Sequence, residues 1–140
     1  MRFPFFREGV LCVKYPWVEE YLLSKPGVSD NWQTDWNWHR FYVGEKFFAA
    51  LCCRWEDGEP SLITVKLPPD EGELLRGQYE DVIPGYYMNK VHWNSVRADG
   101  NVPDDVLRVI MDHAWQTGFQ SLTKKKQQQI IQAKEGGATV

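Results

Sequence analysis

The sequence has few of the residue patterns by which enzymes and metal-binding proteins are usually recognised. Its three histidines lie far apart, and its three cysteines are an odd number without the spacing of a metal site. It contains neither a glycine-rich phosphate loop nor a G-x-S-x-G nucleophile motif. We therefore expect a protein that is not an enzyme and that holds no metal ion or other cofactor.

Positive charge and long apolar runs are also scarce. The net charge is −3, which argues against a surface that is basic throughout and suited to nucleic acid or anionic lipid. No run approaches the roughly 20 apolar residues of a membrane helix, and the first residues do not resemble a signal peptide. Because Cys12, Cys52 and Cys53 lack the pattern of a disulfide framework, we expect reduced thiols in a cytoplasmic protein without membrane contacts.

Aromatic side chains are abundant instead. The 140 residues include seven Trp, six Tyr and seven Phe, and 43% of all residues are apolar. These numbers suffice for one compact core, so we expect a single domain over residues 1–140 that exists as a monomer. Residues 1–14 are expected to form an N-terminal extension, and residues 136–140 a flexible tail.

The hydrophobic pattern predicts strands in the middle of the chain and helices around them. Helices are expected from Pro16 to the stop signal Lys25-Pro26-Gly27, over Asp70–Tyr79, over 103–117 and over Thr123–Lys134. Strands are expected over Trp38–Val43, Lys46–Arg54, Leu62–Leu67 and Val91–Ala98, with a loop or irregular edge over 28–37. This order predicts the α+β class, as a two-layer sandwich in which an antiparallel sheet packs against helices.

Alternation along the strands predicts which side chains share a face. Strict alternation puts Phe47 on one face of its strand, and Phe48 with Ala50 on the other. In the last strand, Trp93 is expected to be buried in the core, beneath the helix over 103–117.

The residues around the start of the last strand are a first candidate site. Lys90, His92 and Asn94 would form a polar surface ridge able to bind phosphates or base edges. The alternative is that Asn89 and Asn94 cap backbone groups and that His92 is simply exposed or hydrogen-bonded.

Other basic side chains could extend this site across the sheet. Four of them lie on or beside the expected strands: Arg40, Lys46, Lys66 and Arg97. If several share a sheet face with Tyr42 or the nearby tryptophans, they make a basic and aromatic surface of the kind that binds nucleic acid. The candidate nucleic-acid-binding residues are therefore Arg40, Lys46, Lys90, His92, Asn94 and Arg97.

A cluster of tryptophans supports a different hypothesis. Trp32, Trp36 and Trp38 lie close together in the sequence and would form an aromatic patch that docks another protein. A basic rim around this patch would favour nucleic acid, and its absence would favour a protein partner. The run Lys124-Lys125-Lys126 is either a solvated helix face or a further attraction for nucleic acid.

The stretch from Ile83 to Asn94 combines a Pro84-Gly85 turn with a strand start rich in polar and aromatic residues. Three other pieces accompany it in order: Leu22–Gly27, Phe41–Ala49, and Asp99–Asp105 leading to Asp112-His113. Together they resemble the core motifs of the MmcQ/YjbR family of small bacterial proteins, over about Trp17 to Ala133. Tyr87 departs from the pattern, since many members have His there.

The resemblance implies a frataxin-like (CyaY-like) α/β sandwich and DNA binding, the activity often attributed to this family. Weak, non-specific DNA binding by a small non-enzymatic domain is therefore the first functional hypothesis. A protein-interaction module that uses the tryptophan patch is the second.

Overall fold

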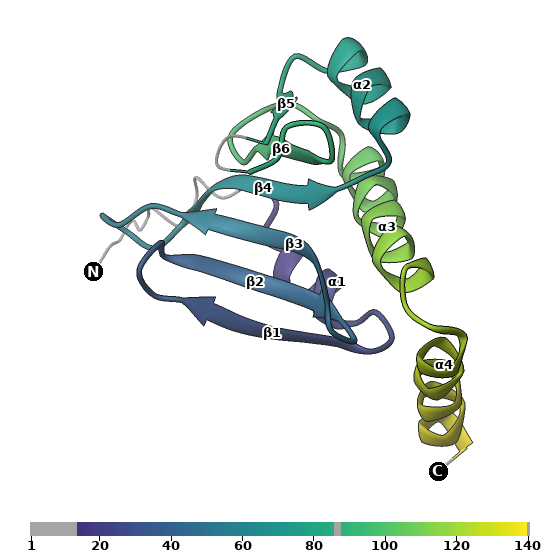
Figure 1. Ribbon diagram of the computed structural model, residues 1–140. Coiled ribbons are helices and arrows are strands. Elements are labelled where there is room, and N and C mark those ends of the chain that lie inside the picture. Colours follow the sequence, from purple (N-terminus) through teal and green to yellow (C-terminus); the bar gives the residue numbers. More distant parts are fainter. Residues whose placement is uncertain (1–13, 86–87, 140) are drawn as a thin grey trace.

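The computed structural model describes residues 14–85 and 88–139, which form a six-stranded antiparallel sheet and four helices (Figure 1). The strands are β1 (Val28–Gln33), β2 (Trp38–Val43), β3 (Lys46–Cys53), β4 (Pro60–Lys66), β5 (Val82–Pro84) and β6 (Trp93–Arg97). The helices are α1 (Val18–Leu23), α2 (Pro69–Gln78), α3 (Asp104–Gln120) and α4 (Lys124–Thr139). The strand order is β1-β2-β3-β4-β6-β5, and every neighbouring pair is antiparallel, so the predicted α+β class is confirmed.

Two strands were not expected from the sequence. The prediction of a loop is wrong for Val28–Gln33, which form the edge strand β1 and pair with β2 from Val28↔Val43 to Gln33↔Trp38. This strand is mostly polar and exposed, so it lacks the apolar alternation by which buried strands are recognised. β5 has only three residues, which is too short for any periodic pattern to be visible.

The two end segments predicted from the sequence lie only partly within the described residues. Apart from Lys14, the expected N-terminal extension lies outside them. Helix α4 runs to Thr139, so the expected tail is helical except for Val140, which also lies outside. Glycine in a helix costs only about 1 kcal/mol relative to alanine, so Gly136 and Gly137 weaken this helix without ending it.

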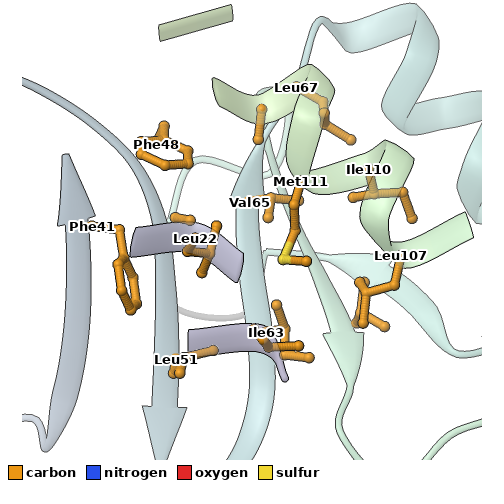
Figure 2. Close-up of a cluster of buried hydrophobic side chains, with 14 of the residues drawn as sticks. Leu22, Phe41, Phe48, Leu51, Ile63, Val65, Leu67, Leu107, Ile110 and Met111 are labelled. Carbon is orange, nitrogen blue, oxygen red and sulfur yellow. The ribbon is translucent and has the colours of Figure 1, made fainter. Parts of the chain in front are cut away.

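One face of the sheet carries the hydrophobic core. Helices α1 and α3 pack on this face, and side chains from both layers interdigitate there (Figure 2). The fully buried side chains come from β2, β3 and β4 on one side and from α1 and α3 on the other: Phe41, Phe48, Ile63, Val65, Leu22, Leu107, Ile110 and Met111. Apolar residues at helical spacing on α3 thus meet apolar residues at every second position of the strands.

No helix of the described residues lies on the opposite face of the sheet, which we call the open face (Figure 1). A smaller cluster of buried side chains, Trp38, Ala50 and Cys52, lies there, and Met88 from the loop between β5 and β6 packs against it. Within the described residues, the sheet therefore has one face closed by helices and one face formed by its own side chains and that loop.

The prediction for Trp93 is right about burial and wrong about its surroundings. Its side chain is 8% exposed, but it points to the open face, where its ring lies 4.8 Å from the ring of Phe47. The neighbouring Val96 and Asn94 face the helices instead. Alternation separates the two faces of a strand, but it does not tell which face the helices cover.

Asn94 is enclosed between β6 and α2. Its side chain is 0% exposed, and its Oδ1 accepts a hydrogen bond from Nη1 of Arg76. A Cβ atom added to Gly72 of α2 would lie 2.8 Å from both Nδ2 and Oδ1 of Asn94. α2 therefore approaches the sheet this closely because residue 72 has no side chain.

This contact predicts opposite effects for two glycines of the same helix. In Gly72→Ala, we expect the clash with the enclosed Asn94 to lower the free energy of unfolding, because overpacking costs about 1–3 kcal/mol and outweighs the gain in helix propensity. In Gly77→Ala, no atom lies within 4 Å of the new Cβ, so the free energy of unfolding is expected to rise by about 0.5 kcal/mol. Urea unfolding of both variants measures the difference, and equal shifts would contradict the close approach at Gly72.

Candidate nucleic-acid interface

The six candidate nucleic-acid-binding residues do not form one surface. Arg40 and Arg97 lie on the open face, on β2 and β6. Lys46 pairs with the buried Val43, and its Cβ lies on the side of Gly118 of α3, so it belongs to the helix-covered side.

The predicted polar ridge before β6 is also divided. Lys90 and His92 are exposed in the turn that precedes the strand. Asn94 was predicted to lie on the surface, and this is wrong because it is buried against α2, out of reach of a surface ligand. Asn89 does cap a backbone group, since its Oδ1 accepts a hydrogen bond from the amide of Val91 at 2.8 Å.

The three tryptophans of the predicted docking patch lie on two sides of the β1–β2 hairpin. Trp36 is 54% exposed and packs edge-on against Trp38, which is 7% exposed on the open face. Trp32 is on the opposite side, where it stacks on His39 with ring centroids 4.8 Å apart. Alternation along β1 and β2 causes this separation, and a single patch of all three residues is therefore wrong.

His39 is held in a polar cluster. The sequence did not predict this cluster because it did not predict the strand β1. It is 3% exposed, its Nε2 lies 2.6 Å from Oδ2 of Asp30, and its Nδ1 lies 3.9 Å from Oε1 of Glu19. The carboxylates fix the orientation of the ring, and Trp32 covers it. Among the described residues, no group of three or more His, Cys, Asp or Glu side chains could hold a metal ion.

The carboxylate of Asp112 has structural partners on α1 and just after it. Asp112 of α3 accepts hydrogen bonds from the hydroxyl of Tyr21, at 2.6 Å, and from Lys25. Burial and the hydrogen bond to Asp112 raise the pKa of Tyr21 to about 12. Burial opposes ionisation of Asp112, but the bonds from Lys25 and Tyr21 prevail and its pKa is lowered. This network ties α1 to α3 on the side away from the open face.

The centre of the open face is a row of small side chains joined across three strands. The hydroxyl oxygens of Thr64 and Ser95 are 2.9 Å apart, and Sγ of Cys52 lies 3.5 Å from the hydroxyl of Thr64. All three residues are buried. Burial raises the pKa of the Cys52 thiol to about 11, with the Thr64 bond acting in the opposite direction. The thiol therefore stays protonated at neutral pH and is a poor nucleophile.

An aromatic row borders this centre. We use the term aromatic row for Tyr42, Phe47 and Trp93, whose rings follow one another at centroid distances of 5.4 and 4.8 Å. Tyr42 and Phe47 remain partly exposed. The tight turn between β2 and β3 brings these two residues together, because it pairs Tyr42 with Phe47.

Cations flank the aromatic row. The guanidinium of Arg40 lies 5.9 Å from the ring centre of Tyr42, and its Nε donates to Oδ1 of Asn31 at 3.0 Å. Lys66 of β4 pairs with Trp93 and projects to the same face. Arg97 is farther along β6, and its Nε lies 3.9 Å from Oδ1 of Asp81.

Carboxylates are excluded from the strand surface on this side. Asp30 is the single acidic residue in the six described strands, and it points to His39 on the helix-covered side. The strands therefore present three cations and no anion to the open face, although the net charge of the chain is −3.

None of the described helices is long and apolar enough to cross a membrane.

Comparison with known proteins gives bacterial relatives. The uncharacterized protein YjbR of Escherichia coli K12 is 30% identical over 113 residues, covering 81% of this chain and 93% of YjbR. The uncharacterized protein YyaQ of Bacillus subtilis is 29% identical over 58 residues, covering 41% of this chain and 48% of YyaQ.

Solved structures share the fold at lower identity. The crystal structure of a Deinococcus radiodurans protein with a DUF419 domain has a TM-score of 0.74 at 22% identity, covering 85% of this chain and 88% of that one. A Pseudomonas syringae crystal structure has a TM-score of 0.59 at 20% identity, covering 71% and 93%. The family model described as YjbR matches residues 23–117, more than half of the sequence. The chain therefore belongs to the YjbR family, and the resemblance seen in its sequence is confirmed.

Proposed function

We propose that this protein is a small, non-enzymatic binding protein that holds nucleic acid weakly at the open face of its sheet. The observation that carries the proposal is the charge of this face, where Arg40 and Lys66 stand beside the aromatic row and Arg97 lies farther along β6, without any strand carboxylate. Cations bind phosphates and aromatic rings stack on bases, so this combination suits a nucleic acid. We further propose that the protein acts as a monomer in the cytoplasm, where Cys52 and Cys53 remain free thiols.

The number of cations limits the strength of binding. Each neutralised phosphate contributes about 0.9 to the slope of log affinity against log salt, so three contacts give a slope of about −2 to −3. Such a site has an affinity in the non-specific range, with a Kd of about 10⁻⁴ to 10⁻⁶ M at physiological salt.

A protein partner is a weaker candidate. A docking surface for a protein usually centres on a contiguous cluster of buried aromatic anchors. Here the exposed tryptophans of the predicted patch, Trp32 and Trp36, lie on opposite sides of the hairpin, so they cannot anchor the same partner surface.

The proposal is tested by removing equal amounts of charge from two places. We expect the Arg40→Ala/Lys66→Ala variant to bind labelled DNA more weakly than wild type and to lower the salt slope by about 2. The matched variant, Lys124→Ala/Lys126→Ala, removes two exposed charges from α4, which packs at the end of the sheet beside Gly27 and Gly44 and not over the open face (Figure 1). It is expected to keep most of the affinity.

The measurement is a titration of labelled DNA, both single-stranded and duplex, at two salt concentrations. Absence of binding to either form at low salt would refute the proposal. Equal losses in the two variants would also refute it, because the attraction would then come from total charge and not from the open face.

A further inference from the structure

We infer that the ligand of the open face is a single-stranded nucleic acid, whose unpaired bases stack on Tyr42 and Phe47 while its phosphates contact Arg40 and Lys66. This inference rests on the proposed function and names the class of ligand. Four features of the open face support it: its width, the position of its aromatic rings, the position of its cations, and the hydrogen bonds that its polar groups already make with one another.

The width of the sheet disfavours a duplex. Six strands form one continuous sheet, and at about 4.8 Å per strand pair they span about 24 Å. The major groove of a DNA duplex is about 12 Å wide and admits a helix or a two-stranded ribbon. A duplex could therefore touch the open face only with its outer phosphates, and its paired bases could not reach the aromatic row.

The position of the rings favours unpaired bases. Tyr42 and Phe47 are partly exposed and neighbour one another at 5.4 Å, with Trp93 behind Phe47 at 4.8 Å. Trp93 is almost fully buried and supports Phe47 from the side. A strand whose bases are splayed out can place them on such rings, as sheet-bound single strands do.

The cations lie where the backbone of such a strand would run. Arg40 is on the same strand as Tyr42, with its guanidinium 5.9 Å from the ring centre. Lys66 lies on β4, between the strands that carry Phe47 and Trp93, and pairs in register with Trp93. One cation thus lies beside Tyr42 and the other between the strands of Phe47 and Trp93, and a backbone that contacts both keeps its bases next to the row.

The polar groups of the open face leave little means of reading a base sequence. The hydroxyls of Thr64 and Ser95 bond one another and are buried, so they cannot meet base edges. Stacking tolerates every base because each has a π face. We therefore expect the site to discriminate between single and double strands but only slightly between base sequences.

The test compares strands of the same sequence and exchanges one ring. Full-length protein is titrated with a labelled DNA of about 12 nucleotides, single-stranded or annealed to its complement, a length within the range of single-strand binding sites. We expect the single strand to bind more tightly than the duplex. Tyr42→Leu should weaken single-strand binding on the order of 10-fold, whereas Tyr42→Phe, which keeps the ring, should retain it.

Trp32→Leu is the matched control, because it removes an exposed aromatic ring from the other side of the same hairpin. It should leave binding unchanged, with thermal unfolding used to verify that each variant is folded. Equal or tighter binding of the duplex overturns the inference and leaves the proposed function standing. Single-strand binding that responds to Arg40→Ala/Lys66→Ala but not to Tyr42→Leu also overturns it. Absence of binding to both forms refutes the proposed function itself.

Discussion

Replacement of Phe48 by alanine is expected to lower the free energy of unfolding by about 3–5 kcal/mol. Phe48 is 0% exposed and points from β3 into the core beneath the helices (Figure 2). A Cβ added to Gly118 of α3 would lie 3.4 Å from the Cβ of Phe48, so the helix backbone passes directly over it. Removal of the ring leaves a cavity, and the closely packed helix and strand cannot move together to fill it.

Its neighbour Phe47 is a matched control, because it has the same side chain on the opposite face. Phe47 is only partly buried, so Phe47→Ala is expected to cost about 1–2 kcal/mol. Urea unfolding with linear extrapolation measures both variants. Equal costs would mean that the two faces of the sheet are equally well packed, contrary to the open face described above.

Trp93→Ala is expected to destabilise the protein by about 3 kcal/mol, since a nearly buried indole is lost. The location of the loss can be tested by double-mutant cycles. The ring of Trp93 lies 4.8 Å from that of Phe47, so combining Trp93→Ala with Phe47→Ala should give a coupling of about 0.5–1.5 kcal/mol.

The contrasting cycle pairs Trp93→Ala with Ile110→Ala. Ile110 is 2% exposed on α3, on the other side of the sheet, and its effect should add to that of Trp93 within about 0.5 kcal/mol. Strong coupling to Ile110 and none to Phe47 would return Trp93 to the core beneath α3, where the sequence pattern alone predicted it.

The class of fold was predictable from the sequence because its buried elements have clear periods. α3 carries apolar residues at helical spacing, and all four expected strands exist. The irregularities were not predictable. The register shifts between Phe41 and Tyr42, so Tyr42 pairs with Phe47 and Phe41 with Ala49. Because of this shift, Phe48 lies on the helix-covered face. Strict alternation had placed it on the same face as Ala50, which is the open face. The finer likeness to a frataxin-like fold stays a prediction.

The sequence predicted the candidate site only on the condition that its basic residues share a face of the sheet. Arg40, Lys66 and Arg97 were expected to matter if they shared a face with Tyr42, and β-strand pairing brings them to that face. Lys46 and Asn94 appeared equivalent to them in sequence but lie on the other side. Pairing between distant strands decides such questions, and a single strand pattern contains no information on it.

The two ends of the sheet differ in how they resist the addition of another strand. At one end, β5 has three residues and finishes with Pro84, which has no amide hydrogen to donate. At the other end, β1 is twice as long, with six residues including Ser29, Asp30 and Asn31, and no other described strand pairs with its outer edge. Polar side chains of this kind bind water along the backbone edge and so hinder the addition of another strand. We expect the amides and carbonyls of β1 that no described strand pairs to be hydrated, which protects a chain rich in aromatic residues from joining edge to edge with its own copies.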